Sequence, residues 1–335
     1  MAATPPPAGP PTPPGVEPRP GHQAGHGREP AVAWPCRSLW RSRHRPEDPD
    51  RFLAGLRQEA RRVKERGAGA LEFHADACGL DARYAEPGPW REAAAILAAE
   101  GLGASVHLPY VWPDLTSLDQ PVWEGSVASV LGALRATAAL APQLAAVHPA
   151  NYATQALVLA TPAAERPALL EELAARLVTA LHRLQAEAPP EAAGALALEN
   201  LEGMPWPLFV RVVRAAGVAV CLDAGHAVSN GDDPVSMVRE VGDRLRGIHL
   251  HDALPPGPAA GAWVGAAAPA AGVTGRAHLP LGSGRLALDQ LAAALRQRGF
   301  AGPVVLELDD DGALPEATRL FREAWQSAAP GATRT

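Results

Sequence analysis

The sequence contains few cysteines. There are three among its 335 residues; they stand far apart, at Cys36, Cys78 and Cys221, and no two of them form a CxxC pair. An odd number of isolated cysteines indicates no disulfide framework, which is typical of a protein in a reducing compartment. We therefore expect free thiols and a cytoplasmic protein.

Long apolar runs and an excess of basic residues are also missing. No uncharged apolar segment approaches the length that a membrane-spanning helix requires. Acidic residues outnumber basic ones, 36 to 30, and the formal net charge is −6, so the composition gives no sign of the basic surface that nucleic acids bind. We expect no membrane contact, and the charge disfavours nucleic acid as a partner.

Core-forming residues are nearly absent from the first 30 residues. This segment is rich in proline and lacks the apolar stretch of a secretory signal. Its composition predicts a disordered tail over 1–30. Over the whole chain 47% of the residues are hydrophobic, which is enough for a large core, and we expect a single domain over 31–329.

Short apolar segments alternate with helical patterns along that domain. In the segment 48–67, for example, Phe52, Leu56 and Val63 fall near helical spacing, and Gly67 supplies a stop. Eight strand–helix pairs predict an α/β fold, a (β/α)8 TIM barrel, rather than an open doubly wound sheet. The predicted strands are 31–36, 70–74, 104–108, 144–148, 195–199, 218–223, 245–251 and 304–308.

One connection is unusually long. Residues 253–277, between the seventh strand and its helix, are rich in alanine, glycine and proline. A connection of that length predicts either a lid or an unstructured insertion. In a barrel it would lie on the catalytic face.

Seven of the eight predicted strands end in histidine or carboxylate residues. Side chains at the carboxyl ends of barrel strands form the active site, so we predict an inward-facing cluster there. Imidazoles and carboxylates without thiolates favour Zn²⁺, Mn²⁺, Co²⁺ or Fe²⁺. The alternative is a hydrogen-bonded polar layer with neutral histidines. The residues are Glu72 and His74, His107, His148, Glu199, Asp223 and His226, His249 and His251, and Glu307.

Seven short motifs carry a resemblance to a known superfamily. They are VHLPY (106–110), VHPANY (147–152), LENLEG (198–203), CLDAGH (221–226), GIHLHD (247–252), HLPLGSG (278–284) and VVLELD (304–309). Because these motifs occur in this order, the sequence resembles the xylose-isomerase-like TIM barrels over residues 34–326. That superfamily includes sugar and sugar-phosphate isomerases and epimerases and the endonuclease IV family. The cobamide-remodelling phosphodiesterases are another branch with similar LDxGH and HLH segments.

The resemblance implies a set of metal ligands. In the isomerases and epimerases a mononuclear site matches Glu199, Asp223, His249 and Glu307, with His226 beside it. The endonuclease IV branch holds three zinc ions, and its additional positions match His107, His148 and His278. One further ligand position, which is a carboxylate in that branch, corresponds to Arg276 in this sequence, so the third metal subsite departs from the family's pattern.

Two enzymatic hypotheses follow. The first is a phosphoester hydrolase with several Zn²⁺ or Mn²⁺ ions and a small phosphorylated metabolite as substrate. Three extra histidines favour it, and Arg276 could clamp a phosphate. The alternative is a mononuclear sugar or sugar-phosphate isomerase or epimerase in which Glu199 and Glu307 move a proton. The predicted substrate contacts are His251, Arg276, Glu72 and Trp112. A non-catalytic barrel and any oligomeric state are also compatible with the sequence.

Overall fold

The computed structural model describes residues 29–42, 45–255 and 276–328. Nearly all of the predicted tail and most of the predicted insertion over 253–277 lie outside these ranges. The three cysteines are free, as predicted. Within the described ranges no helix is long and apolar enough to cross a membrane.

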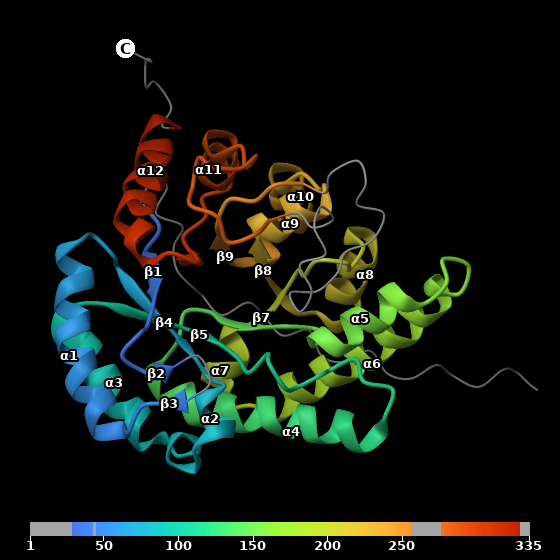
Figure 1. The fold of residues 1–335 in the computed structure, drawn as a ribbon, viewed down its shortest axis with the longest axis horizontal. Helices are drawn as coiled ribbons and strands as arrows, with labels where there is room; N and C mark the ends of the chain where they lie inside the picture. Colours follow the sequence, from blue (N-terminus) through green and yellow to red (C-terminus); the bar gives the residue numbers. More distant parts are fainter. Residues whose placement is uncertain (1–28, 43–44, 256–275, 329–335) are drawn as a thin grey trace, which may run out of the picture.

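Eight parallel strands close into a barrel, which confirms the predicted fold class (Figure 1). Their order around the barrel is β1-β10-β9-β8-β7-β6-β5-β4. Each of them overlaps a predicted strand. The bounds are β1 (Val32–Pro35), β4 (Ala70–His74), β5 (Gly103–His107), β6 (Ala145–Val147), β7 (Leu196–Glu199), β8 (Ala219–Asp223), β9 (Leu245–Leu250) and β10 (Val304–Leu306).

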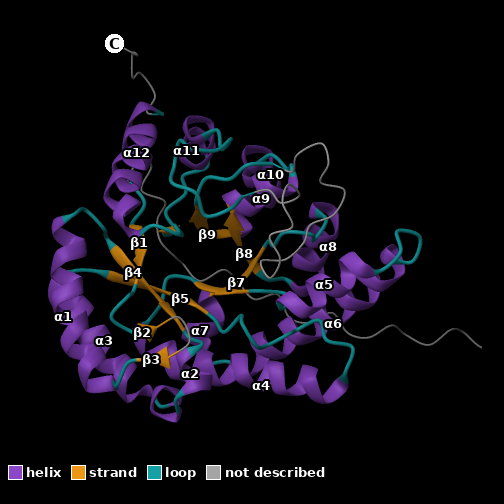
Figure 2. Ribbon diagram, viewed as in Figure 1, coloured by secondary structure: helices purple, strands orange, loops and turns teal. Residues whose placement is uncertain are grey.

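Helices surround the barrel (Figure 2). A separate antiparallel pair, β2 (Trp40–Ser42) and β3 (Arg45–Pro46), follows β1. The helices are α1 (Pro49–Glu65), α2 (Ala77–Leu80), α3 (Pro87–Glu100), α4 (Gln120–Thr137), α5 (Tyr152–Ala160), α6 (Arg166–Glu187), α7 (Pro190–Ala195), α8 (Trp206–Ala216), α9 (Ala224–Asn230), α10 (Pro234–Val241), α11 (Leu288–Gln297) and α12 (Leu314–Ser327).

Helix α1 illustrates how local sequence sets an element. Its N-cap, Asp48, accepts a hydrogen bond from the backbone N–H of Asp50, and Pro49 occupies the first turn. Both features favour a helix start. Phe52, Leu56 and other apolar side chains on one face are buried against the barrel. The periodic segment predicted over 48–67 is therefore a helix.

A small apolar cluster fills the barrel interior below the site. Most of its members are alanines, so the inner layer is compact. Side chains alternate between the two faces of a strand, and the next inward position lies two residues further on. The cluster consists of Ala33, Ala70, Leu144, Ala146, Ala197, Cys221 and Val305. Five members of the cluster are followed, two residues later in the chain, by a polar residue on the same face of the strand. These polar residues are Glu72, His148, Glu199, Asp223 and Glu307.

Candidate metal centre

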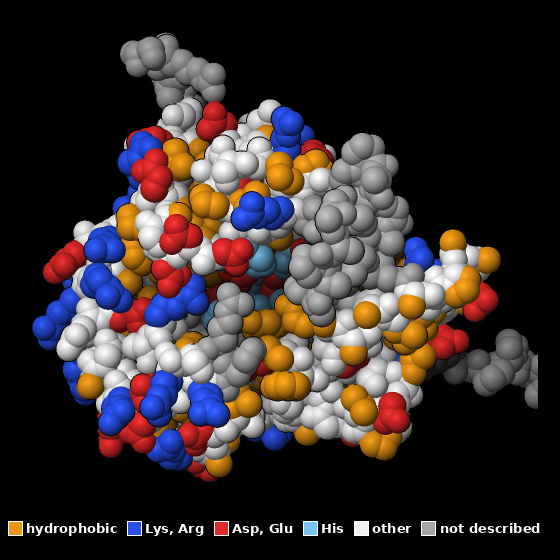
Figure 3. All heavy atoms as spheres, in the orientation of Figure 1, with side chains coloured by type: hydrophobic (Ala, Val, Ile, Leu, Met, Phe, Trp, Pro, Cys, Tyr) orange, Lys and Arg blue, Asp and Glu red, His pale blue; other side chains and the backbone are white. Residues whose placement is uncertain are grey.

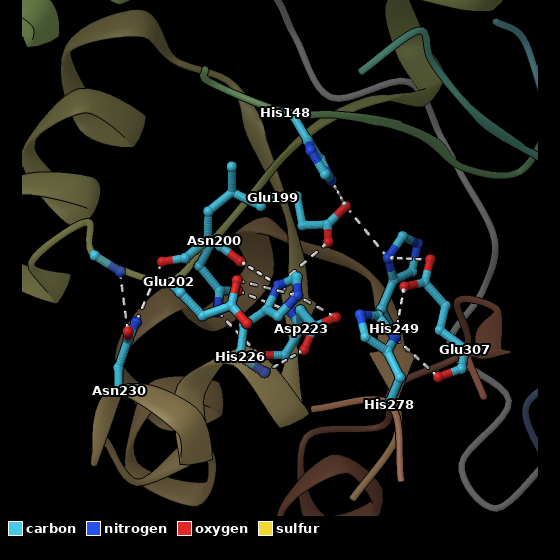
Figure 4. Close-up of polar contacts among 12 residues, drawn as sticks. His148, Glu199, Asn200, Glu202, Asp223, His226, Asn230, His249, His278 and Glu307 are labelled. Carbon is cyan, nitrogen blue, oxygen red and sulfur yellow. Dashed lines mark hydrogen bonds and ion pairs between the residues drawn. The ribbon is translucent and has the colours of Figure 1, made fainter. Parts of the chain in front are cut away.

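The predicted inward-facing residues come together at the carboxyl ends of the barrel strands. Parallel pairing aligns Asp223 on β8 with His249 on β9, and Glu199 on β7 with Cys221 below Asp223. Glu199, Asp223 and His249 are each 0% exposed. Histidine and acidic side chains gather in a hollow near the middle of the face seen in Figure 3. Figure 4 shows their side chains converging.

Four of these residues form a central group. Ligand atoms of Glu199, Asp223, His249 and Glu307 all lie within 4.8 Å of one another. His249 Nδ1 lies 3.2 Å from Glu199 Oε2 and 3.0 Å from Glu307 Oε1. This is the set that the resemblance implied for a mononuclear site.

Unsatisfied polar atoms show that the central group fits a cation. Both carboxylate oxygens of Glu199, both ring nitrogens of His249 and Oε1 of Glu307 are buried, and among the described residues they approach one another as ion pairs without forming a hydrogen bond. Burying polar atoms without hydrogen bonds costs free energy that a metal ion would offset. Imidazole and carboxylate ligands suit Zn²⁺ or Mn²⁺.

The electrostatics of the central group are strongly coupled. Burial alone would raise the pKa of Glu199, but His249 and His148 lower it well below its usual range. Burial raises the pKa of Glu307, although His249 opposes that shift. Burial would lower the pKa of His249, but the surrounding groups, among them Glu199 and Glu307, raise it well above the usual range. In the metal-free protein His249 therefore neutralises part of the buried negative charge.

A second group adjoins the first through Glu199. Nε2 of His107 lies 3.6 Å, and Nε2 of His148 3.4 Å, from Glu199 Oε2. Nδ1 of His107 lies 2.9 Å from the carbonyl oxygen of Leu108, so a ring N–H can donate there and leave Nε2 free to ligate. His148 Nε2 is buried without a hydrogen-bond partner in the described part of the chain. His107, His148 and Glu199 could together hold a second ion.

A third group contains His226, His251 and His278. The backbone N–H of His278 donates to His251 Nδ1 at 2.9 Å, and Nε2 of the same ring lies 3.1 Å from Asp223 Oδ1. Both nitrogens of His251 are thus engaged by the protein, which leaves neither lone pair for a metal. His278 has a positive φ of 54°, and its side chain is 36% exposed. In His226 and His278 the ring Nδ1 lies 3.1 Å from a carbonyl oxygen, that of Asn200 and of Glu307 respectively, so only Nε2 of each could bind an ion here. This group is therefore less complete than the other two.

Glu72 lies beneath the central group rather than in the open hollow. It is 0% exposed, and its Oε2 lies 3.5 Å from His249 Nε2. A carboxylate on one imidazole nitrogen commonly orients the other nitrogen toward a metal. The neighbouring prediction from the same strand, His74, stacks on His107 with ring centroids 5.2 Å apart.

The predicted substrate contacts lie in different environments. His251 is fully buried against Asp223, and this geometry supports the ligand set rather than a direct contact with substrate. Trp112 is 66% exposed. Arg276 is exposed, and its carbonyl oxygen accepts a hydrogen bond from the backbone N–H of Leu254. Substrate contact by Trp112 and Arg276 stays a prediction.

Sequence reasoning missed two polar residues of the site. Asn200 brackets Asp223: its Nδ2 donates to the Asp223 carbonyl at 2.9 Å, and its Oδ1 accepts from the Asp223 N–H at 2.8 Å. Glu202 Oε2 lies 3.5 Å from His226 Nε2. Both residues stand in the LENLEG motif just after Glu199, so their position after a strand end was the available signal.

Fold and site together define a (β/α)8 barrel with a buried histidine–carboxylate cluster at the carboxyl ends of its strands. Within this class the chain belongs to the xylose isomerase-like TIM barrel family, whose model matches residues 60–327. No curated protein matches it significantly in sequence.

Solved structures share the fold at low sequence identity. A D-tagatose 3-epimerase-like protein is 16% identical, with a TM-score of 0.63 over 88% of this chain and 97% of its own. D-psicose 3-epimerase from Clostridium cellulolyticum H10 is 16% identical, with a TM-score of 0.61 over 89% and 99%. A xylose isomerase domain protein from Planctomyces limnophilus is 14% identical, with a TM-score of 0.60 over 90% and 98%. The enzyme names among these neighbours agree with the prediction of an enzyme.

Proposed function

We propose that the chain is a divalent-metal-dependent isomerase or epimerase that acts on a sugar or sugar phosphate. The observation that carries the proposal is the placement of Glu199 and Glu307. Glu199 ends β7 and Glu307 follows β10, yet their carboxylates lie 3.2 and 3.0 Å from one atom, His249 Nδ1. Two carboxylates that approach one point from separate strands can remove a proton from a carbon and return it from another side.

The residues of the central group have distinct roles in this chemistry. Glu199, Asp223, His249 and Glu307 would hold a Zn²⁺ or Mn²⁺ ion, which would polarise a substrate carbonyl as a Lewis acid. Glu199 and Glu307 would hold or move the proton at the adjacent carbon. Glu72 would keep the His249 ring oriented from below.

The solved neighbours also bear on this choice. Several of them are named as sugar epimerases, so they support the isomerase or epimerase alternative more than the phosphoester hydrolase that the sequence placed first. Because their identity to this chain is 14–16%, their names add support without fixing the substrate. If the substrate is phosphorylated, the exposed Arg276 is a candidate for contact with the phosphate.

Proton exchange tests the proposal directly. The Mn²⁺- or Zn²⁺-loaded protein should incorporate deuterium from D2O at the carbon next to the carbonyl of at least one sugar or sugar phosphate in a broad panel, as measured by NMR. Glu199→Gln and Glu307→Gln should each lower the exchange rate by at least about 100-fold, because general acid–base catalysis is lost. The exposed Glu92→Gln is the matched control and should exchange like the parent. Exchange that persists in both site variants would reject the assignment.

One observation favours a second candidate, a phosphoester hydrolase. The group of His107, His148 and Glu199 could hold an ion of its own, and a mononuclear isomerase has no need of it. Two ions would neutralise the charge on both the attacking and leaving oxygens of a phosphoester. Phosphodiester hydrolysis by a preparation that exchanges no proton on any sugar of the panel would favour this candidate and reject the first.

A further inference from the structure

An apolar pocket lies beside the metal centre. It has an empty volume of about 550 Å³, counting solvent at its mouth, and lies between α5, α6 and the loop that joins β7 to α8. Most of its lining is aliphatic, including Val158, Leu173, Leu177 and Leu208. The Lewis-acid and proton-transfer chemistry proposed above does not use this pocket.

The pocket shares a wall with the metal centre. Pro149 and Ala150 line it and follow His148 directly in the chain. Glu202 also lines it, and the carboxylate of that residue lies 3.5 Å from His226 Nε2. The pocket thus adjoins the centre, and a molecule whose reacting atoms lie at the centre could extend a further group toward it.

Four polar side chains line the pocket, those of Thr116, Thr154, Gln155 and Glu202. The hydroxyls of both threonines donate hydrogen bonds to the carboxylate of Asp114. Gln155 Oε1 is buried at the lining and accepts no hydrogen bond from any described residue. Water fills such a site poorly, because the walls offer it few partners. An apolar group that carries a single hydrogen-bond donor would match both the walls and the free amide oxygen.

We propose that this pocket binds an apolar group, aliphatic or aromatic, of the enzyme's own substrate. The substrate is then amphipathic, with a polar part processed at the metal centre and an apolar part held between α5 and α6. This inference rests on the proposed function only in assigning the polar part of the substrate to the metal centre. Binding of the apolar part depends on the pocket itself and can be measured separately.

Primary alcohols from butanol to octanol are suitable probes, because each combines an alkyl chain with one hydroxyl donor. Titrated into the metal-loaded protein and followed by ligand-observed NMR, they should bind about fourfold more tightly for each added methylene until the pocket is filled. Ala174→Phe, which places a ring in the pocket, should weaken octanol binding at least tenfold. The matched control is Ala175→Phe on the exposed side of α6 and should bind octanol like the parent.

A second variant keeps the test decisive if Ala174→Phe does not fold. Leu173→Ala enlarges the pocket, so the chain length at which affinity stops rising should increase. No dependence of affinity on chain length in the parent, or equal octanol binding by Ala174→Phe and the parent, would overturn the proposal. A change of oligomeric state in Ala174→Phe without any alcohol binding by the parent would also overturn it, since the pocket would then belong to a subunit interface.

Metal content and deuterium exchange, measured on the same samples, separate the two proposals. Alcohol binding without exchange on any sugar would reject the proposed isomerase and leave the apolar site standing. Deuterium exchange without alcohol binding would reject the apolar site and leave the proposed isomerase standing. In the parent and in all three variants the metal content should be the same, because none of the substituted residues is a ligand.

Discussion

At the scale of single residues, Asp223 shows how the protein positions a buried carboxylate. Its side chain caps α9 by accepting the backbone N–H of His226 at 2.6 Å, and His251 Nε2 lies 3.1 Å away on another side. Asn200 holds the backbone of the same residue from both directions. If Asp223 ligates a metal as proposed, contacts of this kind would fix its orientation and raise the affinity of the site.

Gly225 makes room for one of these contacts. A Cβ at this position would lie 1.9 Å from Cε1 of His251. We expect Gly225→Ala to displace the His251 ring and to lower metal affinity about 10–100-fold, as measured by competition with a chelating dye. Gly132→Ala, at a helical glycine in α4 with open space around it, should leave affinity unchanged. Equal affinity in both variants would show that His251 does not support Asp223.

His148 separates the two candidate functions by the number of bound ions. Under the proposed isomerase the parent holds one ion, and His148→Ala should retain it while turnover falls only about 10–100-fold. Elemental analysis of both purified proteins measures this count. Two ions in the parent and one in the variant would contradict the mononuclear site and favour the hydrolase.

At the scale of elements, one aspartate holds together the described parts of the connection between β9 and α11. The carboxylate of Asp252, 1% exposed, accepts backbone N–H groups from Ala253 at 2.8 Å and from Gly282 and Leu286 at 2.9 Å each. The described part of this loop carries His278 to the site, where its backbone N–H reaches His251. The HLPLGSG motif is therefore shaped by a carboxylate from the preceding strand end.

Removing that carboxylate should destabilise the loop and the fold. We expect Asp252→Ala to lower the free energy of unfolding by about 3 kcal/mol or more, because three backbone N–H groups lose a charged acceptor that is itself buried. Urea denaturation measures the change. Asp243→Ala removes a surface ion pair with Arg298 and should cost at most about 1 kcal/mol. Similar costs for both substitutions would refute the role given to Asp252.

At the scale of the whole molecule, the buried histidines make stability depend on pH in the metal-free protein. Burial alone would lower the pKa of His226, but Asp223 and Glu202 raise it from 6.5 to about 9. A raised folded-state pKa contributes stability that is fully present below pH 6.5 and is lost as the pH rises through 9. Burial lowers the pKa of His74 and His278 to about 3, so the stability that depends on these two histidines is lost only as the pH drops below 6.5.

We therefore expect the metal-free protein to lose stability between pH 6.5 and 9. His226 would account for roughly 3 kcal/mol of that loss at most, since one pKa unit corresponds to about 1.4 kcal/mol. Urea denaturation at several pH values, on the parent and on His226→Gln, measures the slope. A slope as steep in the variant as in the parent would show that His226 does not carry the effect.

The sequence by itself determined the barrel and most of the residues that gather in the candidate metal centre. Alternating apolar segments and amphipathic helices specify a parallel sheet covered by helices, and inward positions recur every second residue along a strand. Strand ends such as those at Glu199 and Asp223 could therefore be assigned to one inner layer before the structure was known. Those assignments need only local periodicity and the common direction of the strands.

Only the tertiary structure decided what each of these side chains does. His249 and His251 are two residues apart and share one face of β9, yet their partners differ. The ring of His249 faces the carboxylates of Glu199 and Glu307. The ring of His251 is hydrogen-bonded to Asp223 and to the backbone N–H of His278. Glu72 lies 3.5 Å from His249 beneath the candidate centre, and Glu202 contacts His226 and also lines the apolar pocket. Such roles depend on distances between residues remote in sequence, which closure of the barrel sets and no local pattern encodes.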